Sequence, residues 1–243
     1  MTDSVLIAGR GTQHVDREFL RNLPAPVGTT THQPIPHIQI VNALIETLGF
    51  RHINVVADEY AVSVDGARMF GLLELDYEFS GVRFAIGIRN ANDKSMRLAL
   101  TVGYRVFVCS NMAFKGDFTP VLSKHSKNFN LVDSLSIGVD RIQRNFEPLK
   151  QSICDWKANI LSPNDARLII YEAFVEGKLT VSPRLMRAVH GHYFEPQHDE
   201  FKQATLWSLS NAFTSAFKEL KPMQQYTATA KLGPFLNRHF KPF

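Results

Sequence analysis

The sequence is poor in cysteine: its 243 residues contain only Cys109 and Cys154. Two thiols are too few for a disulfide framework or a thiolate zinc site, so both are expected to be buried apolar residues. The sequence also lacks an apolar run near the roughly 18 residues that cross a bilayer, and its N-terminal apolar run is shorter than that of a secretory signal. These absences predict a cytoplasmic protein with no membrane partner.

A phosphate-binding loop is missing as well, because no Gly-x-x-x-x-Gly-Lys-Ser/Thr string occurs. ATP hydrolysis by that route is disfavoured, and no cofactor is predicted. With 44% hydrophobic residues, the chain can bury one large core. We expect an extended N-terminal arm over residues 1–35 and a single α+β domain over residues 36–243. Within that domain we expect a helix and β-meander over 36–120, a helical half over 121–225 and a basic tail over 226–243.

The spacing of apolar residues predicts the fold. Period-two alternation in the first half indicates strands, and three-four spacing in the second half indicates helices. Pro148 falls within one long helical pattern and is expected to kink it. The sequence therefore predicts an antiparallel β-meander that is covered on one face by helices, including a long kinked helix, with a helical C-terminal half. The expected strands are 53–64, 69–77, 82–90 and 98–108, and the main expected helices are 37–48, 131–160, 163–175 and 201–220.

Positive charge is unevenly distributed along the chain, whose formal net charge is +4. Residues 81–115 contain six lysines and arginines but only one acid, Asp93. The tail from Thr227 carries Lys231, Arg238 and Lys241 without an acid. A basic excess of this kind favours an anionic partner.

The two strands at 82–90 and 98–108 separate apolar from basic residues. Their even positions are apolar, whereas their odd positions are small or basic, so each strand would have one apolar face and one polar face. Arginines along a sheet can bind backbone phosphates while an aromatic ring stacks on a base. The predicted nucleic-acid-binding residues are Arg83, Arg89, Asn90, Lys94, Ser95, Arg97, Arg105 and Phe107.

A structural interpretation of the same arginines is equally open. They could form ion pairs with acids on neighbouring strands and simply keep an exposed face soluble. The candidate partners are Asp58, Glu59, Glu74, Asp76 and Glu78.

Three further groups could support catalysis. The histidines and acids of His190, His192, His198, Asp199 and Glu200 could bind a metal, although a solvated loop is the more ordinary interpretation. Cys109, Ser110 and Asn111, with His125 downstream, could include a nucleophile, although a buried cysteine at a strand end is commoner. The strand acids Asp58, Glu59, Glu74 and Asp76 could serve a metal-dependent nuclease.

Several strings carry a family resemblance. They are Pro36-His37 and the segments 65–71, 87–95, 103–114 and 206–214, which read DGARMFG, GIRNANDKS, GYRVFVCSNMAF and LWSLSNAFT. In these strings the chain resembles a phage/plasmid-like protein family that is defined by a domain of unknown function. The resemblance covers most of the chain and implies an origin in a mobile element. It implies no reaction and no catalytic residues.

The sequence thus favours a non-enzymatic, nucleic-acid-associated protein of a phage or plasmid. Binding or annealing of single-stranded DNA through the basic sheet face is the expected activity. The alternatives are a metal-dependent enzyme acting on nucleic acid or nucleotides, and a counter-defence protein that binds a host protein. Assembly into a homo-oligomer is also left open.

Overall fold

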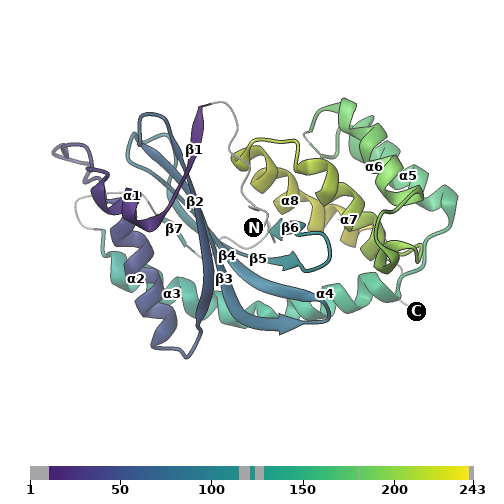
Figure 1. Cartoon of the computed structure of the whole chain (residues 1–243), viewed down its shortest axis with the longest axis horizontal. Helices are drawn as coiled ribbons and strands as arrows, with labels where there is room; N and C mark the ends of the chain where they lie inside the picture. Colours follow the sequence, from purple (N-terminus) through teal and green to yellow (C-terminus); the bar gives the residue numbers. More distant parts are fainter. Residues whose placement is uncertain (1–10, 115–120, 124–128, 180, 241–243) are drawn as a thin grey trace. The chain divides into compact units, whose positions relative to one another are not determined.

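The computed structural model describes residues 11–114, 121–123, 129–179 and 181–240. The α+β class is confirmed, because an antiparallel sheet precedes a helical C-terminal half (Figure 1). By its internal packing the chain forms two compact units. Unit 1 comprises Met1–Arg105 with Phe118–Asn145, and unit 2 comprises Val106–Asp117 with Phe146–Phe243.

The sheet of unit 1 is a meander, as predicted. Strands β1 to β4 pair antiparallel in chain order, β5 follows β4, and β7 pairs antiparallel with β5. Ser80 and Gly81 connect β3 to β4 with φ angles of 48° and 82°, the left-handed conformation that a tight two-residue hairpin turn requires. The strands are β1 (Thr12–Val15), β2 (Val55–Ser63), β3 (Arg68–Phe79), β4 (Val82–Ala91), β5 (Leu98–Val106) and β7 (Val121–Ser123).

Helices cover one face of this sheet. Figure 1 shows α2 (His37–Gly49) and α3 (Leu131–Arg144) side by side against it. Helix α2 buries Ile40, Val41, Leu44 and Leu48, the residues whose spacing predicts it. Its first residue, His37, accepts a hydrogen bond from Asn90 on β4. The even positions of β4 therefore face the helices, as the alternation predicts.

The opposite face is not the open basic surface that the sequence suggests. Leu72 on β3 lies opposite Gly87 on β4, and Glu74 lies opposite Ala85, so these side chains share the odd-numbered face of β4. Leu72 and Ala85 are 0% exposed and Glu74 is 3% exposed. Ala85 and Gly87 have small side chains or none, so neighbouring atoms can pack closely against this face of the sheet.

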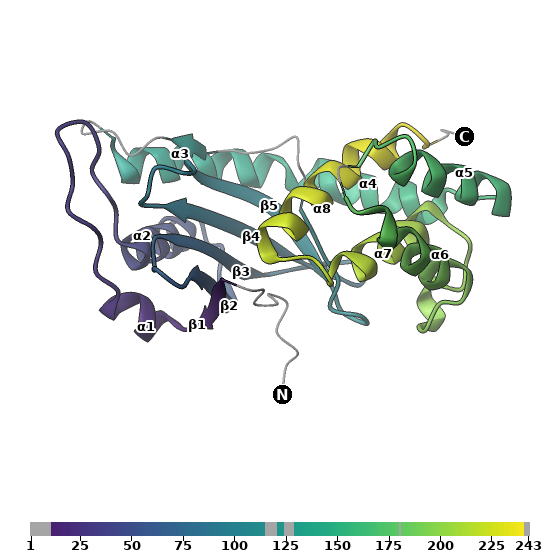
Figure 2. The same cartoon turned by 90° about the horizontal axis from the view of Figure 1, so that it is seen from above.

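Unit 2 is built around α7 (Leu206–Phe217), in which 11 of 12 residues are buried. This helix packs against three other helices of the unit. Phe213 of α7 stacks on Phe174 at a centroid distance of 5.8 Å. The other elements are β6 (Met112–Phe114), α4 (Phe146–Ala158), α5 (Pro163–Phe174), α6 (Met186–Phe194) and α8 (Pro222–Asn237), with 3₁₀ turns at Pro183–Leu185 and Asp199–Phe201 (Figure 2).

The predicted long kinked helix is present as α3 and α4. The break falls at Asn145, the C-terminal cap of α3, and not at Pro148. Pro148 is instead the third residue of α4, within the first turn, where backbone N–H groups have no helical partner. A proline there removes no intrahelical hydrogen bond, so Pro148 does not interrupt α4.

Several elements were not expected. The arm over residues 1–35 contains β1 and a six-residue helix, α1 (Arg17–Asn22). Both are too short to show a period, and β1 depends on pairing with β2. Pro222 is the first residue of α8, a position that suits its fixed φ. Residues 226–237 of the predicted basic tail are therefore helical, and Lys241 lies outside the described residues.

In the part of the chain that the structure describes, no helix is long and apolar enough to span a membrane. The prediction that both cysteines are buried is wrong for Cys154, which is exposed on α4, while Cys109 is half-buried. Cys154 lies one position after the buried Ile153, and therefore turns away from the core.

Candidate functional site

Two turns lie at the same end of the unit 1 sheet, because alternate turns of a meander share an end. The β2–β3 turn runs from Ser63 to Arg68, and the β4–β5 loop runs from Ala91 to Arg97. Arg68 and Ala91 face each other in the sheet register. The backbone N–H of Asn92 donates to the carbonyl of Ala67 at 2.8 Å, which joins the two turns directly.

The β2–β3 turn is held by Asp65. Its carboxylate accepts hydrogen bonds from the Ser63 hydroxyl and from the backbone N–H of Ala67, and both lower the pKa of Asp65. The Ser63 hydroxyl oxygen also accepts a bond from the backbone N–H of Arg68 at 3.0 Å. Gly66 has a φ of +68°, a left-handed conformation that glycine adopts without steric cost.

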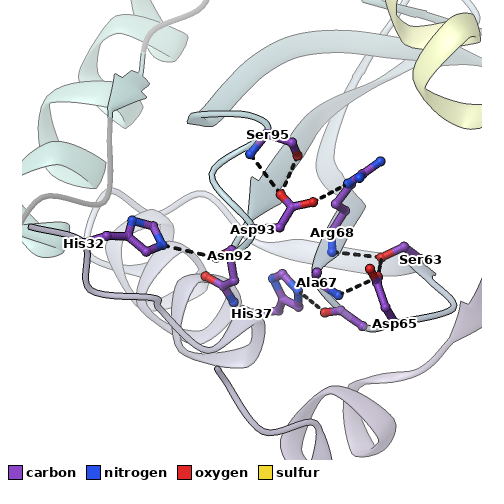
Figure 3. A network of polar contacts seen from close by, with 10 residues as sticks. His32, His37, Ser63, Asp65, Ala67, Arg68, Asn92, Asp93 and Ser95 are labelled. Carbon is purple, nitrogen blue, oxygen red and sulfur yellow. Dashed lines mark hydrogen bonds and ion pairs between the residues drawn. The ribbon is translucent and has the colours of Figure 1, made fainter. Parts of the chain in front are cut away.

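The β4–β5 loop is held by Asp93. Its carboxylate accepts bonds from the backbone and hydroxyl of Ser95, at 2.9 and 2.5 Å, and from Arg68 Nε at 2.7 Å (Figure 3). Partial burial opposes ionisation of this carboxyl, but the bonds from Ser95 and Arg68 outweigh it and lower the pKa of Asp93 to about 2. Asp93 is therefore ionised at neutral pH and fixes the guanidinium of Arg68 beside the loop.

The N-terminal arm fastens the β4–β5 loop. The side chain of Asn92, 5% exposed, accepts a bond from the backbone N–H of Ile35 and donates one to its carbonyl, both at 3.0 Å. The ring of His32 lies 3.1 Å from the Asn92 carbonyl oxygen (Figure 3). The two bonds between the Asn92 side chain and the Ile35 backbone fix the loop just before Asp93 and Lys94.

His37 provides a second, deeper anchor. Its Nδ1 accepts from the Asn90 amide at 2.9 Å, and its Nε2–H donates to the Gly66 carbonyl at 3.0 Å. This pattern requires the neutral ring with its proton on Nε2. Burial lowers the pKa of His37, in agreement with a neutral ring.

The structure separates the eight predicted interface residues into groups. Lys94, Ser95 and Arg97 are exposed on the β4–β5 loop, and Lys94 has a φ of +67°. Asn90 is 0% exposed and bonds His37, so it supports the loop from inside. Arg89 is half-buried on β4. Phe107 is 44% exposed and lies in unit 2, after the end of β5.

Arg83 and Arg105 lie in an ion-pair network around one buried acid. Arg105 Nη1 donates to Glu74 Oε1 at 2.5 Å, and Arg83 Nη1 lies 3.7 Å from Glu74 Oε2. Arg83 also pairs with Glu78. These contacts are the ion pairs with strand acids that the sequence analysis gives as the alternative to phosphate binding. Part of the charge of both arginines is therefore balanced within the sheet.

Arg68 lies beside the exposed residues of the β4–β5 loop and is not among the residues predicted from sequence. Its side chain is 54% exposed and is held beside the loop by Asp93. Topology alone could have indicated Arg68, because the Asp65-Gly66 turn and the β4–β5 loop must lie at the same end of a meander. We call Arg68, Lys94, Ser95 and Arg97 the turn-end surface.

The other candidate groups are placed as follows. Among the described residues, no cluster of three or more His, Cys, Asp or Glu side chains has a geometry that could hold a metal ion. Asp58 pairs with Arg17 at 2.5 Å, and Glu74 pairs with Arg105. His125 lies outside the described residues. Cys109, His192 and His198 line one cavity of unit 2.

Comparison with known proteins gives no match: no family model, no curated protein and no solved structure is significantly similar to this chain.

Proposed function

We propose that the protein binds a single strand of nucleic acid, with single-stranded DNA as the expected form, through the turn-end surface of unit 1. The observation that carries this proposal is that three cationic side chains, Arg68, Lys94 and Arg97, extend from two turns that are bonded to each other. Guanidinium and ammonium groups bind phosphate oxygens directly. A surface of this kind would contact the backbone of the strand and not its bases.

The hydrogen bonds beneath the surface support the proposal. Asp93, Asn92 and the arm residue Ile35 fix the loop backbone through side-chain and main-chain contacts. The cations of a fixed loop lose less freedom when a phosphate binds, so more of the contact energy remains as affinity. Two carboxylates, Asp65 and Asp93, oppose the three cations, and each is already bonded within its own turn, so the surface keeps a net positive charge.

The proposal narrows the interface that the sequence suggests. Arg83 and Arg105 share Glu74 and are not proposed as primary phosphate contacts. The proposed activity is binding without chemistry.

The test measures fluorescence anisotropy of labelled single-stranded DNA at increasing salt. The variant is Lys94→Ala with Arg97→Ala, which removes two exposed cations from the turn-end surface. We expect weaker binding at low salt and a smaller dependence on salt. The same measurement with a duplex of the same sequence shows whether the protein prefers single-stranded DNA.

The chain offers a matched control, Arg141→Ala with Arg144→Ala in the last turn of α3. Arg51, just after α2, pairs with Asp140, so this part of α3 lies at the C-terminal end of α2. His37, at the N-terminal end of α2, contacts the turns. A helix of 13 residues spans about 20 Å, so the control removes the same charge from a distant place in unit 1. Equal weakening by both variants would refute the proposed location.

A further inference from the structure

Unit 2 contains a cavity of about 210 Å³ that the proposed nucleic-acid binding does not use. It lies between the chain that follows β5, the end of α6 and one side of α7. Its polar lining includes a thiol, two imidazoles, two hydroxyls and an ammonium group. These come from Cys109, His192, His198, Ser208, Ser215 and Lys218.

The charge of this lining is one-sided. Among the described residues, the lining contains one lysine and neither aspartate nor glutamate. The acids that influence it electrostatically, Glu200 near Cys109 and Glu219 near His192, are exposed and do not line the cavity. An anion inside the cavity would therefore meet a cation and neutral donors, with no lining carboxylate to repel it.

A hydrogen-bond network fixes the walls. The side-chain amide of Asn111 donates to the carbonyl of Asn211 at 3.1 Å and to Ser215 Oγ at 3.0 Å, and Ser215 donates back to Asn111 Oδ1 at 3.2 Å. The ammonium of Lys218 donates to the carbonyl of Cys109. That contact holds the Lys218 side chain at the cavity.

Burial favours the neutral forms of two titratable groups in the lining, Cys109 and His192. Desolvation raises the pKa of the Cys109 thiol to about 11 and lowers the pKa of His192. At neutral pH the thiol is protonated, and it is not the reactive thiolate that nucleophilic catalysis needs. Cys109 and His192 can therefore serve as neutral hydrogen-bonding partners beside the ammonium group of Lys218.

We propose that this cavity binds a small molecule that carries an oxyanion, either a carboxylate or a phosphate. Lys218 supplies the positive charge, and the imidazole of His192 supplies a directional contact. The volume suits a small ligand, because it is below the roughly 300 Å³ of the smaller drug-sized sites. The site shares no residue with the turn-end surface.

Cys109 provides a reporter, because its thiol lines the cavity. In a Cys154→Ser background, which removes the exposed thiol, the rate of alkylation by iodoacetamide measures access to Cys109. The probes are inorganic phosphate and succinate, each compared with chloride at equal ionic strength. We expect one of the two to slow alkylation in a saturable way, and which one does so identifies the oxyanion.

Lys218→Met should abolish this protection, whereas Lys218→Arg should retain part of it. Lys178→Met is the matched control, since Lys178 is exposed in the same unit and does not line the cavity. Circular dichroism establishes that each variant is folded. Absence of protection by either probe, or full protection in folded Lys218→Met, would overturn the proposal. Loss of DNA binding in the turn-end variant is measured separately and does not bear on it.

Discussion

Replacing Glu74 by alanine is expected to destabilise unit 1 strongly. Glu74 is 3% exposed, and Arg105, which donates to it, has a side chain that is only 16% exposed. Removing the carboxylate leaves the Arg105 charge largely buried without its main partner, a change that typically costs 3–5 kcal/mol. Because some solvent reaches Arg105, we expect a loss of about 3 kcal/mol in the free energy of unfolding.

The matched control is Glu78→Ala. Glu78 pairs with Arg83 on the same sheet, but its side chain is 49% exposed, so the loss should stay below about 1 kcal/mol. Both tryptophans, Trp156 and Trp207, lie in unit 2, so their fluorescence does not follow unit 1 directly. Amide hydrogen exchange in β3, β4 and β5 is the appropriate assay. Equal exchange in the two variants would refute the view that Glu74 anchors these arginines.

Three further predictions concern the turns and the buried titratable groups. Gly66→Ala should lower the free energy of unfolding by about 1–2 kcal/mol because φ is +68°, whereas Gly49→Ala, with open space at its Cβ, should be neutral or stabilising in chemical denaturation. The lowered pKa of His37 means that the unfolded state binds more protons, so stability should fall as pH drops below about 6.5, and His37→Gln should reduce this dependence in urea unfolding at several pH values. With a pKa of about 11, Cys109 should be alkylated at pH 8 more than about a hundredfold more slowly than an ordinary thiol, and the exposed Cys154 should react first by peptide mass spectrometry.

Local patterns were sufficient to predict much of unit 1. The alternation in β4 and the Ser80-Gly81 turn correspond to one strand and one hairpin of the structure. The three-four spacing from Ile40 to Leu48 corresponds to α2. In each case the signal is contained within one element. The short strand β1 escapes prediction because it depends on β2, which is 40 residues away in the chain.

The candidate site shows the same division. Lys94 and Arg97 could be placed on a loop from sequence, because polar residues separate two apolar strands. The burial of Asn90 could not be predicted from sequence, since it depends on the position of His37 at the start of α2. The pairing of Arg105 with Glu74 depends on strand register and on the choice among several acids, neither of which spacing determines.

The cavity of unit 2 is lined by side chains that lie far apart in the sequence. Cys109 and His192 are 83 residues apart, and each was weighed as part of a different catalytic site. Folding brings them to one cavity together with Lys218. Burial raises the pKa of the thiol and keeps it protonated, which argues against the nucleophile interpretation.

The salt dependence of DNA binding tests the central claim most directly. Each phosphate contact on a single strand contributes about 0.7 to the slope of log affinity against log salt concentration. Lys94→Ala with Arg97→Ala should therefore reduce the slope by about 1.4, whereas Arg141→Ala with Arg144→Ala should leave it unchanged. An unchanged slope in the first variant, or an equal reduction in both, would contradict a nucleic-acid interface at the turn-end surface.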